Sequence, residues 1–199
     1  MPDCNLYEDS KYFCTACKYE MSNEQVGQLE QDLSASIEDS YNDKAEVLKS
    51  ILDEHKDTFH PQHYLILLLK WLLINLYGRR KEYQYPILSQ DLIQDKLDYC
   101  QDYLQAMDVI DPGLSHNRGL VLWEIYSVKA FILSQQFTSG QISKSEFKTE
   151  ISEFVPLLQE VRQCLEYISV PGTVEGQVYK MALRALVNTK ETLTFIDLM

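Results

Sequence analysis

Two cysteines near the start of the chain, Cys14 and Cys17, have the residue type and the spacing of metal ligands. A Cys-x-x-Cys pair supplies half of a tetrahedral zinc site, which needs four ligands. Cys4 is the only further cysteine nearby, because Cys100 and Cys164 stand singly much later in the chain. The sequence therefore predicts an incomplete zinc site at Cys14 and Cys17, to which Cys4 could add a third ligand.

Two other interpretations of the cysteine pair remain open. A redox-active dithiol normally begins a helix after a strand of a βαβ unit, and no strand is predicted before Cys14. A disulfide framework is disfavoured because the chain has five cysteines and its start, Met1-Pro2-Asp3, lacks the basic and apolar runs of a signal peptide. The sequence thus predicts an intracellular protein, cytoplasmic or nuclear, with mostly reduced thiols.

The rest of the sequence contains no recognisable catalytic motif. It lacks a phosphate loop, a dinucleotide-binding glycine motif, a Gly-x-Ser-x-Gly motif and a His-Glu-x-x-His motif. His60 and His63 could share a metal, but Pro61 between them favours a capping and surface role. The chain alone is therefore predicted to bind partners without catalysing a reaction, and no catalytic residue or cofactor of its own is predicted.

Acidic residues are concentrated in the first third of the chain. Residues 1–60 contain 14 Asp and Glu against 5 Lys and Arg, a net charge of −9, whereas the whole chain has a net charge of −12. Such a segment repels nucleic-acid phosphates and attracts basic partners, so the predicted partners are basic or Lys-rich peptides and not nucleic acid. The simpler alternative is a solvated helix face that keeps the protein soluble.

Seven segments have helical periodicity, and none has the sustained alternation of a strand. They begin near residues 22, 43 and 61, after residue 89, and near residues 117, 143 and 173. Capping boxes are predicted at Ser22 and Ser143, and Pro61 is predicted to begin the third helix with His60 as its cap. The longest apolar run, Tyr64 to Tyr77, is interrupted by Lys70 and is shorter than the roughly twenty residues of a membrane span. We interpret it as a buried core helix.

The order and the loops of these segments predict an all-α fold. Seven helices with mostly short connections favour antiparallel neighbours. Small residues such as Ala182 and Ala185 at contact positions favour stacked helix hairpins of the tetratricopeptide type, although the 34-residue repeat signature is not visible. Cys100 lies on the apolar stripe of the fourth helix and is predicted to be a small core residue and not a ligand.

Residues 107–127, MDVIDPGLSHNRGLVLWEIYS, resemble the C-terminal helical domain of the SET and MYND family of protein-lysine methyltransferases, in particular its arthropod members. In that family a helix ends in Asp-Pro-Gly, followed by Ser-x-x-Arg-Gly and an apolar helix that contains Leu-Tyr-Glu. The segment HPQHYLILLLKWLLINLYG, residues 60–78, resembles another segment of the family, and the likeness covers about residues 11–135. The residues that match in the first segment are Asp111, Pro112, Gly113, Ser115, Arg118, Gly119, Leu122 and Glu124, with Trp123 at the position where the family usually has Tyr.

The resemblance implies a function for the chain as a whole. Residues 1–21 would be the remnant of a Cys-rich zinc region whose other ligands lie upstream, and residues 22–199 would be the tetratricopeptide-like C-terminal domain. The MYND and SET motifs are absent, so S-adenosylmethionine would bind only to full-length relatives. The implied function is a non-catalytic interaction or regulatory module joined to a SET domain, and the alternative is a free-standing tetratricopeptide-like adaptor.

The segment 111–118 also gives two structural expectations. Gly113 should have a positive φ, since it takes the second corner of a tight turn after Pro112. Arg118 begins an apolar helix and needs acceptors for its donors, so it should pair with a carboxylate or with helix-end carbonyls across the turn.

Overall fold

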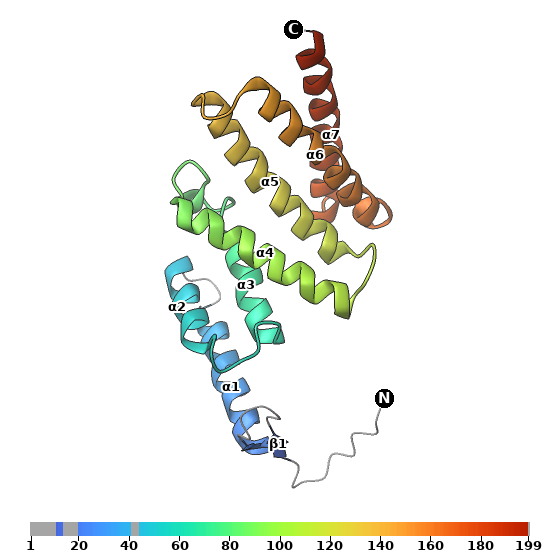
Figure 1. The fold of residues 1–199 in the computed structure, drawn as a ribbon. Helices are drawn as coiled ribbons and strands as arrows, with labels where there is room; N and C mark the ends of the chain where they lie inside the picture. Colours follow the sequence, from blue (N-terminus) through green and yellow to red (C-terminus); the bar gives the residue numbers. More distant parts are fainter. Residues whose placement is uncertain (1–10, 14–19, 41–43, 199) are drawn as a thin grey trace. The chain divides into compact units, whose positions relative to one another are not determined.

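The computed structural model describes residues 11–13, 20–40 and 44–198 of the 199-residue chain (Figure 1). These residues form seven α-helices with two very short strands, so the all-α prediction is confirmed. The α-helices are α1 (Asn23–Ser40), α2 (Ala45–His55), α3 (Tyr64–Leu76), α4 (Gln90–Ile110), α5 (His116–Thr138), α6 (Lys144–Leu165) and α7 (Val174–Leu198). The short elements are the strands β1 (Lys11–Phe13) and β2 (Glu20–Ser22) and the 3-10 helices η1 (Lys81–Tyr83) and η2 (Glu166–Ile168).

The chain divides into two compact units, residues 1–69 and residues 70–199. The division falls inside α3. It does not bear on the predicted boundary between residues 21 and 22, because that boundary rests on cysteines outside the described residues.

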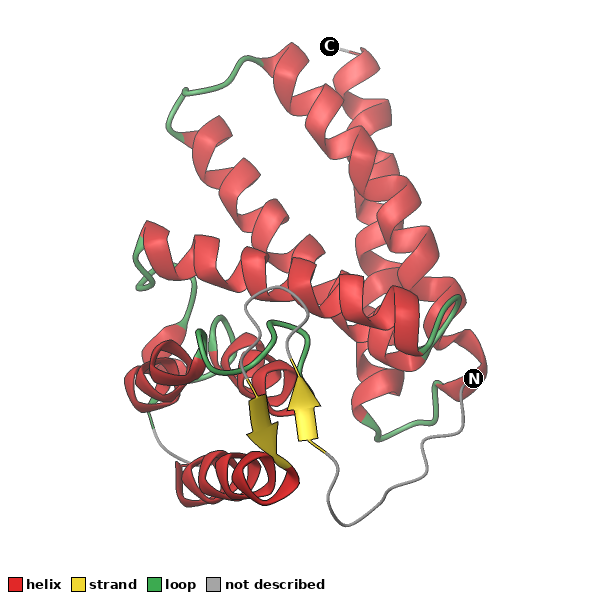
Figure 2. Ribbon diagram, turned by 60° about the horizontal axis from the view of Figure 1, so that its bottom comes forward, coloured by secondary structure: helices red, strands yellow, loops and turns green. Residues whose placement is uncertain are grey.

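In unit 1 the two strands form a small antiparallel hairpin that precedes α1 (Figure 2). Lys11 pairs with Ser22 and Phe13 with Glu20 in its register. Neither strand was predicted, because three residues are too few to show alternation. The capping box of α1 is present as predicted: the Ser22 hydroxyl accepts from the Gln25 N–H at 3.1 Å, and the Gln25 side chain accepts from the Ser22 N–H at 2.9 Å.

The start of α3 differs from the prediction. His60 and Pro61 lie in a turn before the helix, which begins at Tyr64. The His60 carbonyl accepts from the His63 N–H at 2.8 Å, so this turn closes before the helix begins. Nδ1 of His60 accepts from the N–H of Gln62 at 3.2 Å, so His60 does cap a backbone N–H, but that of the turn. Nδ1 of His63 accepts from the N–H of Leu65 at 3.4 Å at the start of the helix itself.

In unit 2, α5, α6 and α7 run alternately in opposite directions, and each packs on the next (Figure 1). α4 also packs on α5, so each of these four helices contacts its neighbour in the sequence. α5 additionally contacts α7 and therefore has neighbours on several sides, as its apolar circumference predicts. The order agrees with helix hairpins, while stacking of the tetratricopeptide type stays a prediction.

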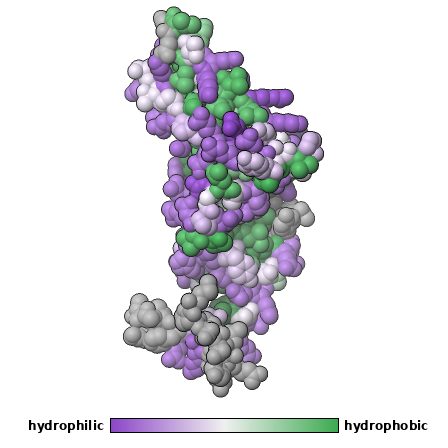
Figure 3. Space-filling view, turned by 90° about the vertical axis from the view of Figure 1, so that its right-hand side faces the viewer, coloured by the Kyte–Doolittle hydropathy of each residue, from purple (hydrophilic) through white to green (hydrophobic). Residues whose placement is uncertain are grey.

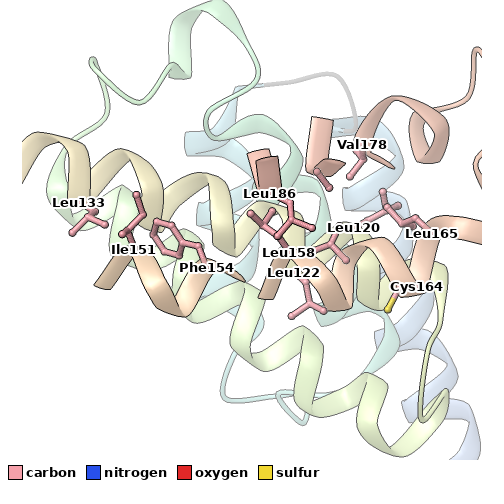
Figure 4. Close-up of a cluster of buried hydrophobic side chains, with 12 residues drawn as sticks. Leu120, Leu122, Leu133, Ile151, Phe154, Leu158, Cys164, Leu165, Val178 and Leu186 are labelled. Carbon is pink, nitrogen blue, oxygen red and sulfur yellow. The ribbon is translucent and has the colours of Figure 1, made fainter. Parts of the chain in front are cut away.

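The main core of unit 2 lies between α5, α6 and α7 (Figure 4). Leu158 and Leu165 of α6 are completely buried there, and Phe154 packs edge-on against Tyr126 of α5 with ring centroids 5.2 Å apart. α6 begins with the predicted capping box, in which the Ser143 hydroxyl accepts from the Glu146 N–H at 3.2 Å. A smaller cluster of Ile74, Cys100 and Val121 joins α3, α4 and α5, so Cys100 is a core residue as predicted.

Among the described residues, none of the helices combines the length and the apolar composition that crossing a bilayer requires.

Candidate functional site

The turn between α4 and α5 has the conformation that its sequence predicts. Gly113 has a φ of +99°, a region that residues with a Cβ rarely adopt, so this expectation is confirmed. The Asp111 N–H closes the end of α4 on the Met107 carbonyl at 2.9 Å. Ser115 caps α5 by accepting the N–H of Arg118 at 3.3 Å. The turn therefore stops one helix and starts the next within five residues.

Arg118 joins three helices at this turn. Its Nε donates to Glu160 of α6 at 2.7 Å and its Nη1 donates to Asp108 of α4 at 2.6 Å. Arg118 therefore pairs with two carboxylates, as the sequence led us to expect for at least one. The hydrogen bond that Arg118 donates to Glu160 is the largest cause of a raised pKa of Arg118, which keeps the guanidinium charged.

Gly119 lets α5 approach α6 closely. A Cβ at this position would lie 2.7 Å from Cβ of Cys164 and 2.9 Å from the Leu165 side chain. Only a glycine fits between these side chains without displacing them. Five of the residues that resemble the SET and MYND family thus end, cap, tie or pack helices, namely Asp111, Gly113, Ser115, Arg118 and Gly119.

A second group of residues, centred on Lys96, was not predicted. Lys96 is 0% exposed on α4 and Glu124 is 2% exposed on α5. Nζ of Lys96 donates to Glu124 Oε2 at 2.6 Å, to the Tyr77 carbonyl at 2.5 Å and to the Tyr85 hydroxyl at 3.1 Å. All three ammonium protons therefore have an acceptor, which a buried charge requires.

Arg79 adds a second cation to this group. Its Nε donates to Glu124 Oε1 at 3.0 Å, and its Nη2 donates to the same oxygen. Arg79 follows the end of α3, and its side chain pairs with this buried carboxylate. With Lys96 and Arg79 protonated and Glu124 ionised, the group has a net charge of +1, and the excess lies on Arg79, whose side chain is 37% exposed.

Burial dominates the acid-base behaviour of these residues. Desolvation lowers the pKa of Lys96, and the neighbouring Glu124 carboxylate opposes this shift without cancelling it. Burial also raises the pKa of Cys100 to about 12, so this thiol stays protonated at neutral pH. Desolvation, together with Glu124, raises the pKa of Tyr85 well above its ordinary value.

The sequence did contain a signal for the buried pair. Lys96 lies three residues after Ile93 and four before Cys100, which places it on the buried stripe of α4. Glu124 stands in a helix that is apolar almost all round. An acid and a base that each occupy an apolar stripe are expected to meet, because a buried charge needs a partner.

Gly78 positions Tyr85 beside this pair. Gly78 has a φ of +84°, and its N–H donates to the Tyr83 carbonyl at 2.7 Å. A Cβ on Gly78 would lie 2.4 Å from the Tyr85 ring. The ring also stacks on Phe131 with centroids 5.3 Å apart, so the hydroxyl of Tyr85 is held in place next to Lys96.

Two cavities of unit 2 share Tyr85 as a wall. One, of about 350 Å³, lies where Arg79, Glu124 and Ser127 meet α7. The other, of about 490 Å³, lies between the loop before α4 and the end of α5 and contains no charged side chain in its wall. Of these two cavities, the first is therefore the one with a cation in its wall.

Apolar surface accompanies the first cavity. Figure 3 faces the side of Figure 1 on which α7 lies, and green apolar areas interrupt the polar surface there. The large apolar side chains that α7 exposes are Val174, Met181, Val187, Phe195 and Leu198. Val174 and Met181 also line the cavity.

In unit 1, α1 presents an acidic face. The helix has five carboxylates and no Lys or Arg. Glu30 pairs with His63 Nε2 at 2.9 Å. Because Nδ1 of His63 accepts a backbone N–H, Nε2 has the proton and donates to this carboxylate.

The other four carboxylates of α1 remain on its exposed surface. At 100° per residue they span about a third of the helix circumference, on the side opposite the buried residues Leu33 and Ile37. Within the residues that the structure describes, none of the four forms an ion pair. They are Glu24, Asp32, Glu38 and Asp39.

The predicted zinc ligands Cys4, Cys14 and Cys17 lie outside the described residues. Within residues 11–13, 20–40 and 44–198, no three His, Cys, Asp or Glu side chains are grouped as metal ligands would be. The zinc prediction and the dithiol alternative therefore stay predictions.

Comparison with known proteins adds no identification: no family model, curated protein or solved structure matches this chain. The likeness to the SET and MYND family consequently rests on the motifs in residues 60–78 and 107–127.

Proposed function

We propose that the chain is a non-catalytic interaction module that binds basic, Lys-rich peptides through the acidic face of α1. The observation that supports this proposal is the arrangement of Glu24, Asp32, Glu38 and Asp39 on one side of a helix without a basic residue. Carboxylates on one face that form no ion pair attract a cationic chain over about one Debye length. The contribution of each exposed contact is small, so the proposal needs several of them to act together.

The proposed context is a methyltransferase of the SET and MYND type, in which this module would help to bind the substrate or a partner. The turn 111–119 supports this context, since five of the matching residues have a defined structural use there. The same observation favours a second candidate, a free-standing helical adaptor, because residues that serve packing can be shared by helical domains of different function. Both candidates lack catalytic activity of their own.

Peptide binding can be tested with a fluorescein-labelled Lys-rich peptide and fluorescence anisotropy. Replacing the four acidic residues with their amides should weaken binding at low salt by at least about tenfold, since four contacts of a few tenths of a kcal/mol or more add to about 1.4 kcal/mol. Added salt should weaken binding to the native chain and have a smaller effect on the variant. The variant combines Glu24→Gln, Asp32→Asn, Glu38→Gln and Asp39→Asn.

A matched control removes the same charge elsewhere. Four exposed acidic residues of unit 2 are replaced with amides, namely Asp91, Glu150, Glu153 and Glu191. If this control weakens binding as much as the α1 variant does, net charge alone explains the interaction and the acidic face is not the site.

Catalytic inertness has a separate test. The chain is incubated with a Lys-rich peptide and radiolabelled S-adenosylmethionine, and cofactor binding is measured by calorimetry. The proposal expects neither label transfer nor heat of binding. A dissociation constant for the cofactor in the micromolar range would contradict it.

A further inference from the structure

The cavity of about 350 Å³ in unit 2 has one polar end and one apolar wall. Arg79, Tyr85 and Glu124 form the polar end, and Val174, Val178 and Met181 are among the apolar residues. Its volume is at the lower end of the range for small-molecule sites in proteins. The cavity therefore suits a small amphipathic ligand.

Arg79 gives the polar end a positive character. Glu124 is engaged on both oxygens, by Arg79 and by Lys96, and its side chain is only 3% exposed. Nη1 of Arg79 forms no hydrogen bond with any described residue, and this side chain is 37% exposed. The guanidinium thus has donors left for a ligand, and the group of three charges has one positive charge in excess.

Tyr85 provides a further donor. Its hydroxyl oxygen accepts a proton of Lys96, so its own hydrogen must point elsewhere. The part of the chain that the structure describes offers no acceptor for this hydrogen. Burial and Glu124 raise the pKa of Tyr85, so the hydroxyl keeps its proton at neutral pH and can donate it.

The remaining wall is mostly apolar, apart from Ser127 and Gln177. Val178 is 2% exposed, and Trp123 lines the cavity from α5. Apolar contact with this wall contributes about 25 cal/mol per Å² of surface removed from water. A ligand with one anionic end and an apolar body satisfies both ends at once.

We propose that this cavity binds a small carboxylic acid, with the carboxylate on Arg79 and Tyr85 and the apolar stem against α7. The site is independent of the proposed peptide surface, because all its residues belong to unit 2 and α1 belongs to unit 1. Two donors from a fixed guanidinium and phenol favour a carboxylate over a neutral amide, since charge-assisted hydrogen bonds are the stronger kind.

The probe for this site is 4-phenylbutyrate, titrated into the full chain by isothermal calorimetry at constant ionic strength. With about twelve non-hydrogen atoms, it should bind with a dissociation constant near 1 mM. The neutral 4-phenylbutyramide has the same stem and should bind at least about tenfold more weakly. Fluorescence of Trp123 in the cavity wall gives a second signal for occupancy.

Two variants remove the site in different ways. Arg79→Gln should weaken binding of the acid at least about tenfold, whereas Arg80→Gln, at an exposed neighbouring arginine, should leave it unchanged. Met181→Glu places a carboxylate in the cavity wall at a residue that is 41% exposed, and it should abolish binding by repulsion without touching the buried pair. If Arg79→Gln does not fold, the affinity of Met181→Glu for the acid is the test of the site.

Three results would overturn the proposal. They are the absence of binding by the acid at about ten times the expected dissociation constant, equal affinity for the acid and the amide, and unchanged affinity in Met181→Glu.

Discussion

Replacing Glu124 with Gln should destabilise unit 2 more than any other single change in the buried charge group. Glu124 is 2% exposed and contacts two cations, so Glu124→Gln leaves Lys96 charged, completely buried and without a counter-charge. Breaking a buried ion pair by removing one partner costs about 3–5 kcal/mol. At pH 7 this cost cannot exceed about 5 kcal/mol, because Lys96 can lose its proton instead. Deprotonation costs about 1.4 kcal/mol for each pH unit between pH 7 and the ordinary pKa of lysine.

Lys96→Met should cost less than Glu124→Gln. The variant removes the buried cation itself, and Glu124 keeps Arg79 as its partner. The variant loses the hydrogen bonds that Lys96 donates to Glu124 and to the Tyr77 carbonyl. We expect this loss to cost about 1–3 kcal/mol of stability. In the double variant Lys96→Met, Glu124→Leu, most of the loss should be recovered, because apolar residues of similar volume replace a buried pair at little cost.

The assay is urea unfolding followed by tryptophan fluorescence. Trp71 and Trp123 are the only tryptophans and both belong to unit 2, so the signal reports this unit even if unit 1 unfolds separately. The pH dependence gives a second readout. In Glu124→Gln the folded pKa of Lys96 lies below its unfolded value, so the unfolded chain binds more protons and stability should rise with pH up to about 10. A smaller loss in Glu124→Gln than in Lys96→Met, or a stability of the variant that does not rise between about pH 7 and 9, would refute the reasoning.

Four further changes test individual parts of the fold. Gly113→Val should cost about 1–3 kcal/mol because valine is strained at a φ of +99°, and an unchanged melting temperature would contradict the turn. Gly119→Ala should lower the unfolding midpoint in urea, since the added methyl would lie 2.7 Å from a side-chain atom of α6, and a stable variant would show that the two helices can separate. Cys100 should resist iodoacetamide in the folded chain, as located by mass spectrometry, because burial raises its pKa to about 12; labelling at native pH without unfolding would contradict this. The pKa of Glu146 is lowered by the backbone N–H of Ser143, so its stabilising effect is present above about pH 4.5 and is lost as the pH falls through the lower folded value; Glu146→Gln should remove this acid dependence of thermal stability.

Most of the fold could be predicted because it depends on local chemistry. The capping boxes at Ser22 and Ser143 and the glycine at 113 each act within a few residues, and the apolar periodicity follows from burial of one face. Features that depend on longer-range contacts were not predicted. Arg79 pairs with a residue 45 positions away, and local helix-dipole reasoning does not anticipate such a partner.

The candidate site was less predictable for a related reason. Binding surfaces depend on which side chains converge from different helices, and helical periodicity gives the face of a residue without giving its partner. The positions of Lys96 and Glu124 on apolar stripes are a signal of burial, although the pair was not predicted. Their meeting, the placement of Tyr85 by Gly78 and the resulting cavity required the packing of α4 against α5.

The residues that match the SET and MYND family include Glu124, which lines the cavity of about 350 Å³, but the matching residues of the turn 111–119 do not line it. Asp111, Gly113, Ser115, Arg118 and Gly119 end, cap and pack helices, and none of them lines the cavity of about 350 Å³. A likeness in packing residues indicates that the helices are joined in a similar way. The binding partner depends instead on the exposed side chains around them. Substitutions on the face of α1 and at Arg79 should therefore change binding, and those on α1 should leave the unfolding midpoint nearly constant. Substitutions in the turn should lower the unfolding midpoint and leave binding nearly constant. This contrast separates a shared helical scaffold from a shared function.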